Sequence, residues 1–413
     1  MGDAGPIPLG RTERIAMVGT LAETMLGFRG ELIRDLIAAG HTVYAFAIDY
    51  TPATEQKIRR MGANPVSYRM GQLSANPLSD LSAIFQLHKL FKKHRITLSY
   101  CYFSKPAIYG TLAAKMAGVP KRVAKIEGLG RVFTRKPHGD GLKTHLLRRV
   151  MATLFKVSLP HAHKVLVLNQ GDKEDLQSFS KKIAEPYVLG GIGVCMNRYP
   201  FRPPVTNPIR FVFIGRLLPE KGVRYFVNAA KAIREKHPSV EFVLVGAPDN
   251  KPGAINKAEL KQLVREGTVI WPGPVDDVTP WLAKSSVFVL PTYYREGVPR
   301  STQEALATGR PVITTRMPGC RNTVKEGVNG YLIEPHDQTG LEHAMVRFIQ
   351  NPDLIPTMGI ASYRLACEKF NVRIINRTIM REIGIQPPKA PIQLPHIRPV
   401  NDSITDVQKT AEY

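Results

Sequence analysis

The chain has 413 residues, a length that predicts two or three domains, each with its own core. Hydrophobic residues make up 43% of it and charged residues 22%, which excludes a disordered, collagen-like or coiled-coil protein. No apolar run is long enough to span a bilayer and the first residues show no signal-peptide pattern, so we expect a cytoplasmic protein. The four cysteines lie far apart in the sequence and predict reduced thiols rather than disulfides or a zinc site.

The formal net charge of +23 is concentrated in one part of the chain. Residues 85–164 hold 17 Lys and Arg residues but only two acidic residues, Glu127 and Asp140. A positive field so localised attracts a polyanion, such as an anionic membrane, a phosphorylated substrate or a nucleic acid. A soluble protein from a lineage with a basic proteome would carry the same excess without a functional reason.

Short apolar runs alternate with helical patterns in the first half of the chain. The helical spacing is clearest at Gly30–Ala39 and Leu81–Lys93. This alternation predicts parallel strands joined by right-handed crossovers. The expected strands are Arg14–Val18, Thr42–Ile48, Leu98–Phe103, Val123–Glu127 and Lys164–Leu168.

The second half repeats the pattern, with helical spacing at Val223–Lys236 and Thr339–Gln350. Its expected strands are Ile209–Ile214, Glu241–Val245, Val269–Trp271, Val287–Leu290, Pro311–Thr314 and Gly330–Ile333. Glycine and proline in residues 191–207 predict a linker. The sequence therefore predicts an α/β protein of two doubly wound domains, with ligands at the carboxyl ends of the strands. We expect an N-terminal tail at 1–12, domains at 13–190 and 208–369, and a Pro-rich tail at 386–413.

The first candidate motif follows the strand Ile209–Ile214. Gly215 and Arg216 come directly after it, and Lys221 precedes the next helix. A glycine lets the backbone approach a ligand, while arginine and lysine beside a helix N-terminus suit a diphosphate. A plain strand–helix turn with surface cations is the alternative.

A second motif follows the strand Val287–Leu290. Glu296 lies in its loop, and Gly297 and Val298 can present free backbone N–H groups. Pro299 is suited to the first helical position, and Glu304 falls within the helix. Carboxylates and amides facing one pocket can bind a polyhydroxylated, phosphorylated molecule. Taken alone, the two glutamates would fit a solvated helix face.

Together, Gly215-Arg216, Lys221-Gly222 and the segment from Glu296-Gly-Val-Pro to Glu304-Ala resemble the donor half of the family 4 glycosyltransferases. The resemblance extends from Arg14 to about Ile383. It implies the GT-B fold, in which two Rossmann-like domains face each other across a cleft. It also implies that the N-terminal domain binds the acceptor, and that a C-terminal helix at 370–384 crosses back to that domain.

The resemblance also implies a role for each matched residue. Arg216 and Lys221 would bind the nucleotide diphosphate and offset charge on the leaving group. Glu296 would hold sugar hydroxyls, and Glu304 the nucleotide ribose. Family members retain the anomeric configuration and need no metal or cofactor; no Asp-x-Asp motif is present, which agrees. The matched donor-binding positions are Gly215, Arg216, Lys221, Glu296, Gly297, Val298, Pro299 and Glu304.

Segments of the N-terminal half indicate which class of acceptor the chain uses. Glu127-Gly-Leu-Gly130, Tyr102-Phe-Ser-Lys-Pro and Gly27-Phe-Arg29 resemble bacterial transferases that extend an undecaprenyl-diphosphate-linked sugar, notably by α1,3-linked N-acetylgalactosamine. Glu127 would then bind sugar hydroxyls near the reaction centre. The alternative is an ion pair of Glu127 with Arg131, Lys125 or Arg122. Arg29 would reach acceptor phosphate, or form a surface salt bridge.

Residues 141–159 predict a basic amphipathic helix. Lys143, Arg148 and Arg149 lie off its apolar stripe, as expected for a helix on an anionic membrane. An ordinary core-facing helix with solvated cations has the same periodicity. The stripe consists of Leu146, Val150, Leu154 and Val157.

We therefore expect a glycosyltransferase bound peripherally to the inner face of the cytoplasmic membrane. Its substrates would be a nucleotide sugar, with UDP-N-acetylgalactosamine first, and a lipid-diphosphate-linked saccharide. A soluble family 4 transferase with another acceptor, or a nucleotide-sugar epimerase, is the alternative. A nucleic-acid-binding module is disfavoured because Tyr100, Tyr102 and Phe103 lie in a buried-type strand, so no nucleic acid partner is expected.

Overall fold

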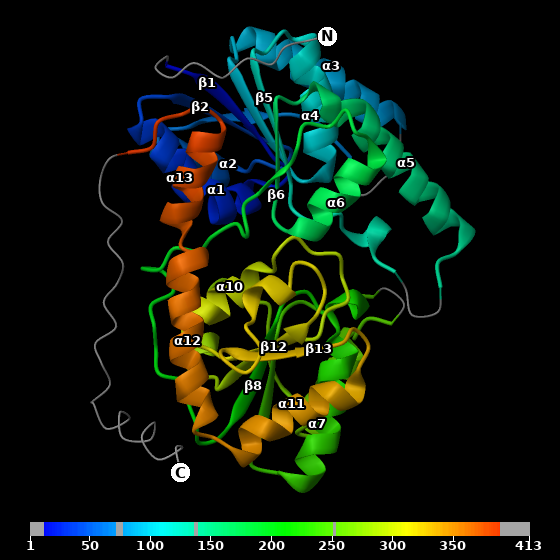
Figure 1. The fold of residues 1–413 in the computed structure, drawn as a ribbon, viewed down its shortest axis with the longest axis vertical. Coiled ribbons are helices and arrows are strands. Elements are labelled where there is room, and N and C mark those ends of the chain that lie inside the picture. The colour runs from blue at the N-terminus through cyan, green and yellow to red at the C-terminus, as the bar shows by residue number, and fades with distance from the viewer. Residues whose placement is uncertain (1–11, 72–76, 136–138, 251–252, 389–413) are drawn as a thin grey trace, which may run out of the picture.

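The computed structural model describes residues 12–71, 77–135, 139–250 and 253–388 (Figure 1). These residues form two α/β domains, each built on a sheet whose paired strands are all parallel. The expected α/β class and GT-B-like arrangement are confirmed, because apolar runs separated by helices have produced two crossover-linked sheets.

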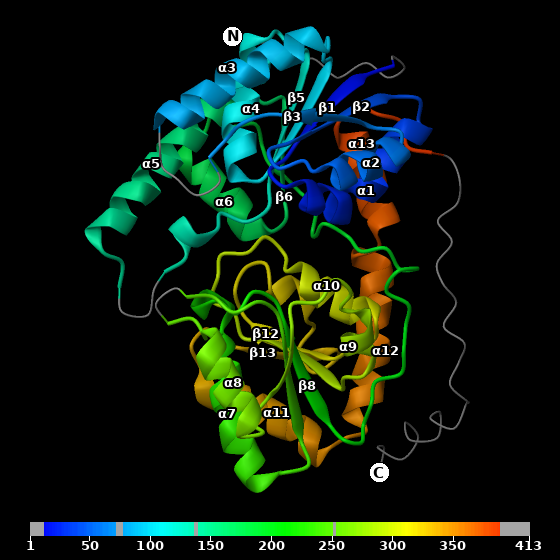
Figure 2. The ribbon, with the colours of Figure 1, turned by 180° about the vertical axis from the view of Figure 1, so that it is seen from behind.

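The first sheet has the strand order β3-β2-β1-β4-β5-β6-β7, so the order reverses beside β1. Its helices α3, α4, α5 and α6 pack in succession along one side of the domain (Figure 2). The strands are β1 (Arg14–Val18), β2 (Thr42–Ala47), β3 (Asn64–Ser67), β4 (Leu98–Tyr102), β5 (Lys121–Ile126), β6 (Lys164–Val167) and β7 (Tyr187–Val188). The helices are α1 (Ala22–Ala38), α2 (Pro52–Arg60), α3 (Pro77–Lys93), α4 (Ser104–Met116), α5 (Leu142–Ser158) and α6 (Gln170–Phe179).

The second sheet has the order β10-β9-β8-β11-β12-β13, with its reversal between β8 and β11. A ligand is expected at such a switch point, beyond the carboxyl ends of the strands. The strands are β8 (Arg210–Ile214), β9 (Glu241–Val245), β10 (Ile270–Gly273), β11 (Val287–Leu290), β12 (Val312–Thr315) and β13 (Gly330–Ile333). The helices are α7 (Val223–Lys236), α8 (Lys257–Arg265), α9 (Thr279–Ala283), α10 (Arg300–Ala307), α11 (Gln338–Gln350) and α12 (Leu354–Lys369).

Alternation along the first sheet divides its apolar residues between two cores. On β1, Ala16 and Val18 join the core under α3, α4 and α5, while Ile15 and Met17 face the other side. That second core continues without a break through Val194 into the second domain. The two domains therefore share one hydrophobic core in addition to the separate core of the first.

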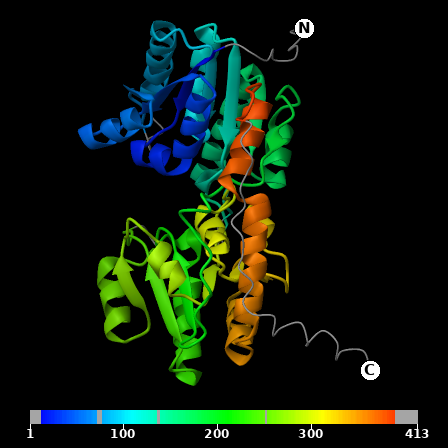
Figure 3. The same ribbon diagram turned by 90° about the vertical axis from the view of Figure 1, so that its left-hand side faces the viewer.

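The last helix, α13 (Val372–Glu382), returns from the second domain to the first, as the resemblance implied (Figures 1 and 3). It packs against α1, where Arg373 Nη1 and Asn376 Nδ2 each donate to the Asp35 carboxylate at 2.7 Å. At the crossing, Val194 N donates to Phe370 O, and the amide of the first α13 residue donates to Val194 O. Both chain connections between the domains thus run side by side.

Candidate active site

The switch point of the second sheet brings the two donor motifs together. Gly215 and Arg216 follow β8, and a short turn at Pro219–Lys221 leads to Gly222 and α7. Gly222 has φ +78°, and a Cβ there would lie 2.0 Å from the Pro291 carbonyl oxygen after β11. Only glycine fits such a close approach of two loops, so this residue fixes the distance between the motifs.

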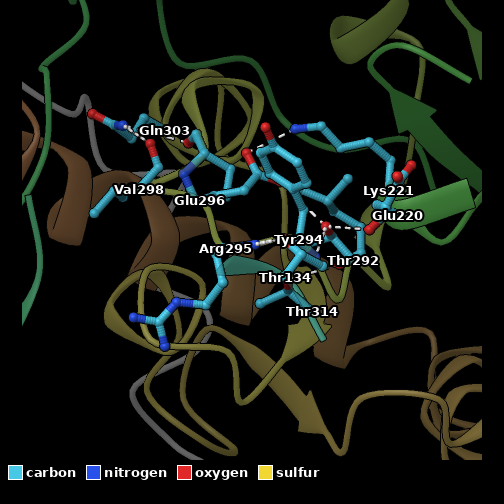
Figure 4. Close-up of polar contacts among 12 residues, drawn as sticks. Thr134, Glu220, Lys221, Thr292, Tyr294, Arg295, Glu296, Val298, Gln303 and Thr314 are labelled. Carbon is cyan, nitrogen blue, oxygen red and sulfur yellow. Dashed lines mark hydrogen bonds and ion pairs between the residues drawn. The ribbon is translucent and has the colours of Figure 1, made fainter. Parts of the chain in front are cut away.

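Lys221 and Glu296 form the central pair of the site (Figure 4). Lys221 Nζ lies 2.7 Å from Glu296 Oε2, and both side chains are largely buried. Thr292 Oγ1 lies 3.3 Å from Glu296 Oε1 and donates to the Glu220 carbonyl at 2.9 Å. The carboxylate and ammonium expected to serve the donor therefore neutralise each other in the structure without a ligand.

Arg216 is exposed, and its side chain makes no hydrogen bond or ion pair with any residue that the structure describes. Its charge nevertheless acts at Tyr294, whose pKa is raised by burial and lowered in part by Arg216. Arg216 thus lies near the Lys221–Glu296 pair with its guanidinium free to bind an anion.

The amides that follow Glu296 belong to buried residues and have no acceptor among the residues that the structure describes. Gly297 and Val298 are both buried, and neither backbone N–H donates to another described residue. Buried N–H groups of this kind are rare, which indicates a ligand that supplies acceptors. Pro299 differs from the prediction: it caps α10 instead of opening it, with a ψ of 128° that is not helical.

Glu304 lies on α10 and is almost fully buried. Its Oε1 accepts hydrogen bonds from Arg300 Nε at 2.7 Å and from the Tyr199 hydroxyl at 2.8 Å. Arg300 in turn lies over the Phe28 ring of the first domain, 4.7 Å from its centroid. The second oxygen, Oε2, has no hydrogen-bond partner among the described residues, and the expected ribose hydroxyl would bind there.

Across from these residues, Glu127 directly follows β5 and lies between two buried basic side chains. It forms an ion pair with Arg29, and its Oε1 lies 3.0 Å from Lys125 Nζ. Burial, and then the charge of Arg29, lower the pKa of Lys125 well below its usual value. The Arg29 guanidinium also lies 4.5 Å from the Tyr102 ring centroid.

This cluster corrects two expectations. Arg29 is only 2% exposed, so its ion pair is not a surface salt bridge, and its guanidinium has no free access to a membrane. Of the three partners considered for Glu127, Lys125 is present, while Arg131 pairs instead with Glu220 of the second domain at 3.2 Å. An ion pair with Arg29 does not prevent Glu127 from facing the reaction centre, and its functional role stays a prediction.

The loop that carries Glu296 also holds the two domains together. A Cβ on Gly128 would lie 2.4 Å from Gly297 N, so the two backbones touch. Gly130 N donates to Arg295 O at 3.0 Å, and Asn169 Nδ2 to Gly297 O at 2.7 Å.

Sequence reasoning missed Arg295, Asn169 and Asp172. The Arg295 side chain pairs with Asp175 and lies 3.7 Å from Asp172, whose pKa burial raises to about 7. The sequence carried a signal for Asn169 alone, because this residue follows β6 at the carboxyl edge of the sheet and caps α6.

The outer face of α5 bears on both interpretations of that helix. Leu146 is 65% exposed, Val150 46% and Val157 54%, so most of the predicted stripe faces outward, while the helix packs on the core through Phe155, and its contact with a membrane stays a prediction. Only Leu154 of the stripe is partly buried against the core. Lys143 and Arg149 are exposed. Arg148 differs, because it donates to Val132 O and Asp140 Oδ2 at 3.1 and 2.8 Å.

Other polar groups have structural partners. His163 accepts from the Arg122 amide, and the ring of His161 lies 3.0 Å from Lys115 Nζ. Asp277 accepts from Thr279 N, the first residue of α9. Among the described residues, no three His, Cys, Asp or Glu side chains could hold a metal ion together, and all four cysteines are free thiols. No described helix is both long and apolar enough to cross a bilayer.

Comparison with known proteins covers both domains. A model of glycosyltransferase family 4 matches residues 30–185, and a model of group 1 glycosyl transferases matches residues 208–351. Campylobacter jejuni N,N'-diacetylbacillosaminyl-diphospho-undecaprenol alpha-1,3-N-acetylgalactosaminyltransferase is 27% identical over 77% of this chain and 84% of its own. Escherichia coli UDP-Gal:alpha-D-GlcNAc-diphosphoundecaprenol alpha-1,3-galactosyltransferase is 28% identical over 65% of this chain and 70% of its own.

Solved structures show the same fold. Anabaena HepE in complex with UDP and glucose superposes with a TM-score of 0.70 at 18% identity, covering 89% of this chain and 98% of its own. The two family models together cover more than half of the sequence, and each falls on one of the two sheets. The chain therefore belongs to the family 4 glycosyltransferases and has the GT-B fold.

Proposed function

We propose that this chain transfers N-acetylgalactosamine from its UDP-sugar to a saccharide linked to undecaprenyl diphosphate, at the inner face of the cytoplasmic membrane. The sugar and the acceptor are those in the name of the Campylobacter relative. The observation that carries the donor side is the pair of buried amides, Gly297 and Val298, which lack acceptors beside the Lys221–Glu296 pair.

The site offers a separate partner for each part of the donor. The Arg216 side chain has no ion pair with a described residue, and Lys221 pairs with Glu296 and lies 5.7 Å from the Tyr294 ring centroid, so both cations can turn to a diphosphate. Release of Lys221 leaves the Glu296 carboxylate to accept sugar hydroxyls. Because these two cations can neutralise the leaving diphosphate, we propose that transfer needs no metal or other cofactor.

We further propose that the anomeric configuration is retained. The acceptor hydroxyl oxygen forms a bond to the anomeric carbon on the face from which the diphosphate departs, and the carbon–oxygen bond to the diphosphate breaks. The departing diphosphate takes the hydroxyl proton, while Arg216 and Lys221 stabilise its charge.

The outer face of α5 supports a membrane-bound acceptor. Exposed leucines and valines alternate there with Lys143 and Arg149. Apolar groups that insert into the lipid boundary, together with cations at about 1 kcal/mol each near anionic headgroups, dock a helix at a bilayer surface. The lipid-diphosphate acceptor would enter beside this helix.

The test is UDP release from UDP-N-acetylgalactosamine with a polyprenyl-diphosphate-linked N-acetylated sugar. We expect acceptor-dependent UDP release that persists in EDTA. In Glu296→Gln the rate of release should fall roughly 100-fold, the size of effect seen when one transition-state contact is removed. Glu235→Gln, an exposed glutamate on α7, is the matched control. Near-full turnover by Glu296→Gln would contradict the proposed site, and loss of release in EDTA would contradict metal independence.

A further inference from the structure

A second polar pocket lies behind the loop that carries Glu296. Its volume is about 400 Å³, within the usual range for ligand sites. It brings together four arginines and one histidine against a single lining carboxylate, Asp175. The lining residues are Phe133, Arg135, His145, Arg148, Arg149, Ala152, Asp175, Phe179 and Arg295.

Both domains contribute to this pocket. His145, Arg148 and Arg149 come from α5, whereas Arg295 comes from the second domain. The Arg295 side chain points away from Lys221, toward the opposite side of the loop (Figure 4). The pocket is therefore separated from the expected donor diphosphate by the backbone of the Glu296 loop.

Two of the four arginines form no hydrogen bond or ion pair within the described part of the chain, although the charge of Arg135 also acts on Asp175. Arg148 is engaged by Asp140, and Arg295 by Asp175. Arg135 and Arg149 are exposed and form no hydrogen bond or ion pair with another described residue. Two free guanidinium groups at one pocket match a ligand with two negative charges, because each can donate a pair of parallel hydrogen bonds to phosphate oxygens.

We propose that this pocket binds the diphosphate of the lipid-linked acceptor, an inference that rests on the proposed function. Arg295 immediately precedes Glu296, so their Cα atoms are about 3.8 Å apart. Such an acceptor needs an anion site about one sugar ring from the reaction centre, on the side away from the donor diphosphate. The exposed Leu142 and Leu146 lie on α5, the helix that contributes His145 and Arg149 to the pocket, and offer the lipid chain an apolar surface.

The experiment compares two acceptors that carry the same saccharide. One is linked to a polyprenyl diphosphate and the other to an uncharged alkyl chain. We expect Arg135→Ala and Arg149→Ala each to lower kcat/KM for the diphosphate acceptor roughly 10- to 100-fold, as for loss of a hydrogen bond between charged groups. The kcat/KM for the uncharged acceptor and the KM for UDP-sugar should change less than twofold.

Lys182→Ala is the matched control, since Lys182 is an exposed cation of the same domain that does not line the pocket. The proposal would be overturned if Arg135→Ala and Arg149→Ala lowered kcat/KM equally for both acceptors, or if Lys182→Ala lowered kcat/KM for the diphosphate acceptor by the same factor. A further measurement is the affinity of Arg149→Ala for anionic phospholipid vesicles that contain no acceptor. The substitution could lower this affinity by the same factor as it lowers kcat/KM for the diphosphate acceptor. That result would assign the pocket to a lipid headgroup and would also overturn it.

The unchanged protein separates this inference from the proposed function. If it transfers sugar to the diphosphate acceptor and the variants do so equally well, only the pocket assignment fails. If it uses a soluble acceptor but no lipid-diphosphate acceptor, the proposed acceptor class and the pocket assignment both fail, while the donor site stands.

Discussion

At the scale of single residues, Glu127 has the least ordinary surroundings in the first domain. Its carboxylate meets two cations, Arg29 and Lys125, that are both almost fully buried. Taking a charge out of water is costly, and a buried charge that loses its partner keeps the whole of that cost. Glu127 therefore has a structural task in addition to its expected place at the reaction centre.

We predict that Glu127→Gln lowers the free energy of unfolding by about 3–5 kcal/mol, because the buried guanidinium of Arg29 loses its counter-charge. Lys125→Met should cost less than about 1 kcal/mol, because burial already disfavours the charged form of this lysine. Urea unfolding measures both. Glu55→Gln is the control, because its partner Arg59 is 61% exposed and the pair contributes little.

The positions of the expected donor residues after strand ends were predictable from sequence, and so was Lys125 as a partner of Glu127, whereas Arg29 as its partner was not. Gly215, Lys221 and Glu296 belong to two short segments whose residue types follow strand ends, so local spacing is enough to identify them. Arg29 and Glu127 are 98 positions apart. Their contact depends on β1 and β5 lying in the same sheet with only β4 between them, which no local pattern encodes.

At the scale of elements, the long apolar strands were predicted well, whereas two short edge strands of the first sheet were missed. The β1, β9, β11 and β13 ranges match the expected strands because strands buried on both faces read as apolar runs. Both missed strands, β3 and β7, lie at the edges of the first sheet. The α5 periodicity identified an apolar stripe, but periodicity cannot say whether a stripe faces the core or the outside.

We predict that Leu146→Glu lowers the affinity for anionic vesicles by about tenfold or more, because one leucine buried in lipid contributes about 1.5–3 kcal/mol. Its thermal stability should be unchanged, because the side chain is 65% exposed. Vesicle sedimentation measures the affinity. Val264→Glu on α8, an exposed apolar residue of the second domain, is the control. Equal binding by the two variants would argue against α5 as the membrane contact.

At the scale of the whole molecule, the shared core and α13 join the two domains. Asp35 of α1 receives hydrogen bonds from two side chains of α13, so it holds α13 against the first domain. Both tryptophans, Trp271 and Trp281, lie in the second domain. Tryptophan fluorescence therefore reports on the second domain, while far-UV circular dichroism reports on both.

We predict that Asp35→Ala lowers the free energy of unfolding by about 1–3 kcal/mol, because the buried amide of Asn376 is left without its acceptor. The fluorescence and circular dichroism transitions should coincide in the unchanged protein and separate in the variant. Asp353→Ala, at the start of α12, is the control for loss of an aspartate away from the contact with α1. Coincident transitions in Asp35→Ala would show that the shared core alone couples the domains.

The paired crossing at Val194 and Asn371 makes the second domain an insertion within the first. The chain enters and leaves it at neighbouring points, the arrangement in which domain insertions are tolerated best. The residues matched to the donor motifs thus lie on one unit between the two crossings, while the α5 surface lies on the first domain. Grafting another family member's unit between these two positions would exchange the sugar and keep the acceptor.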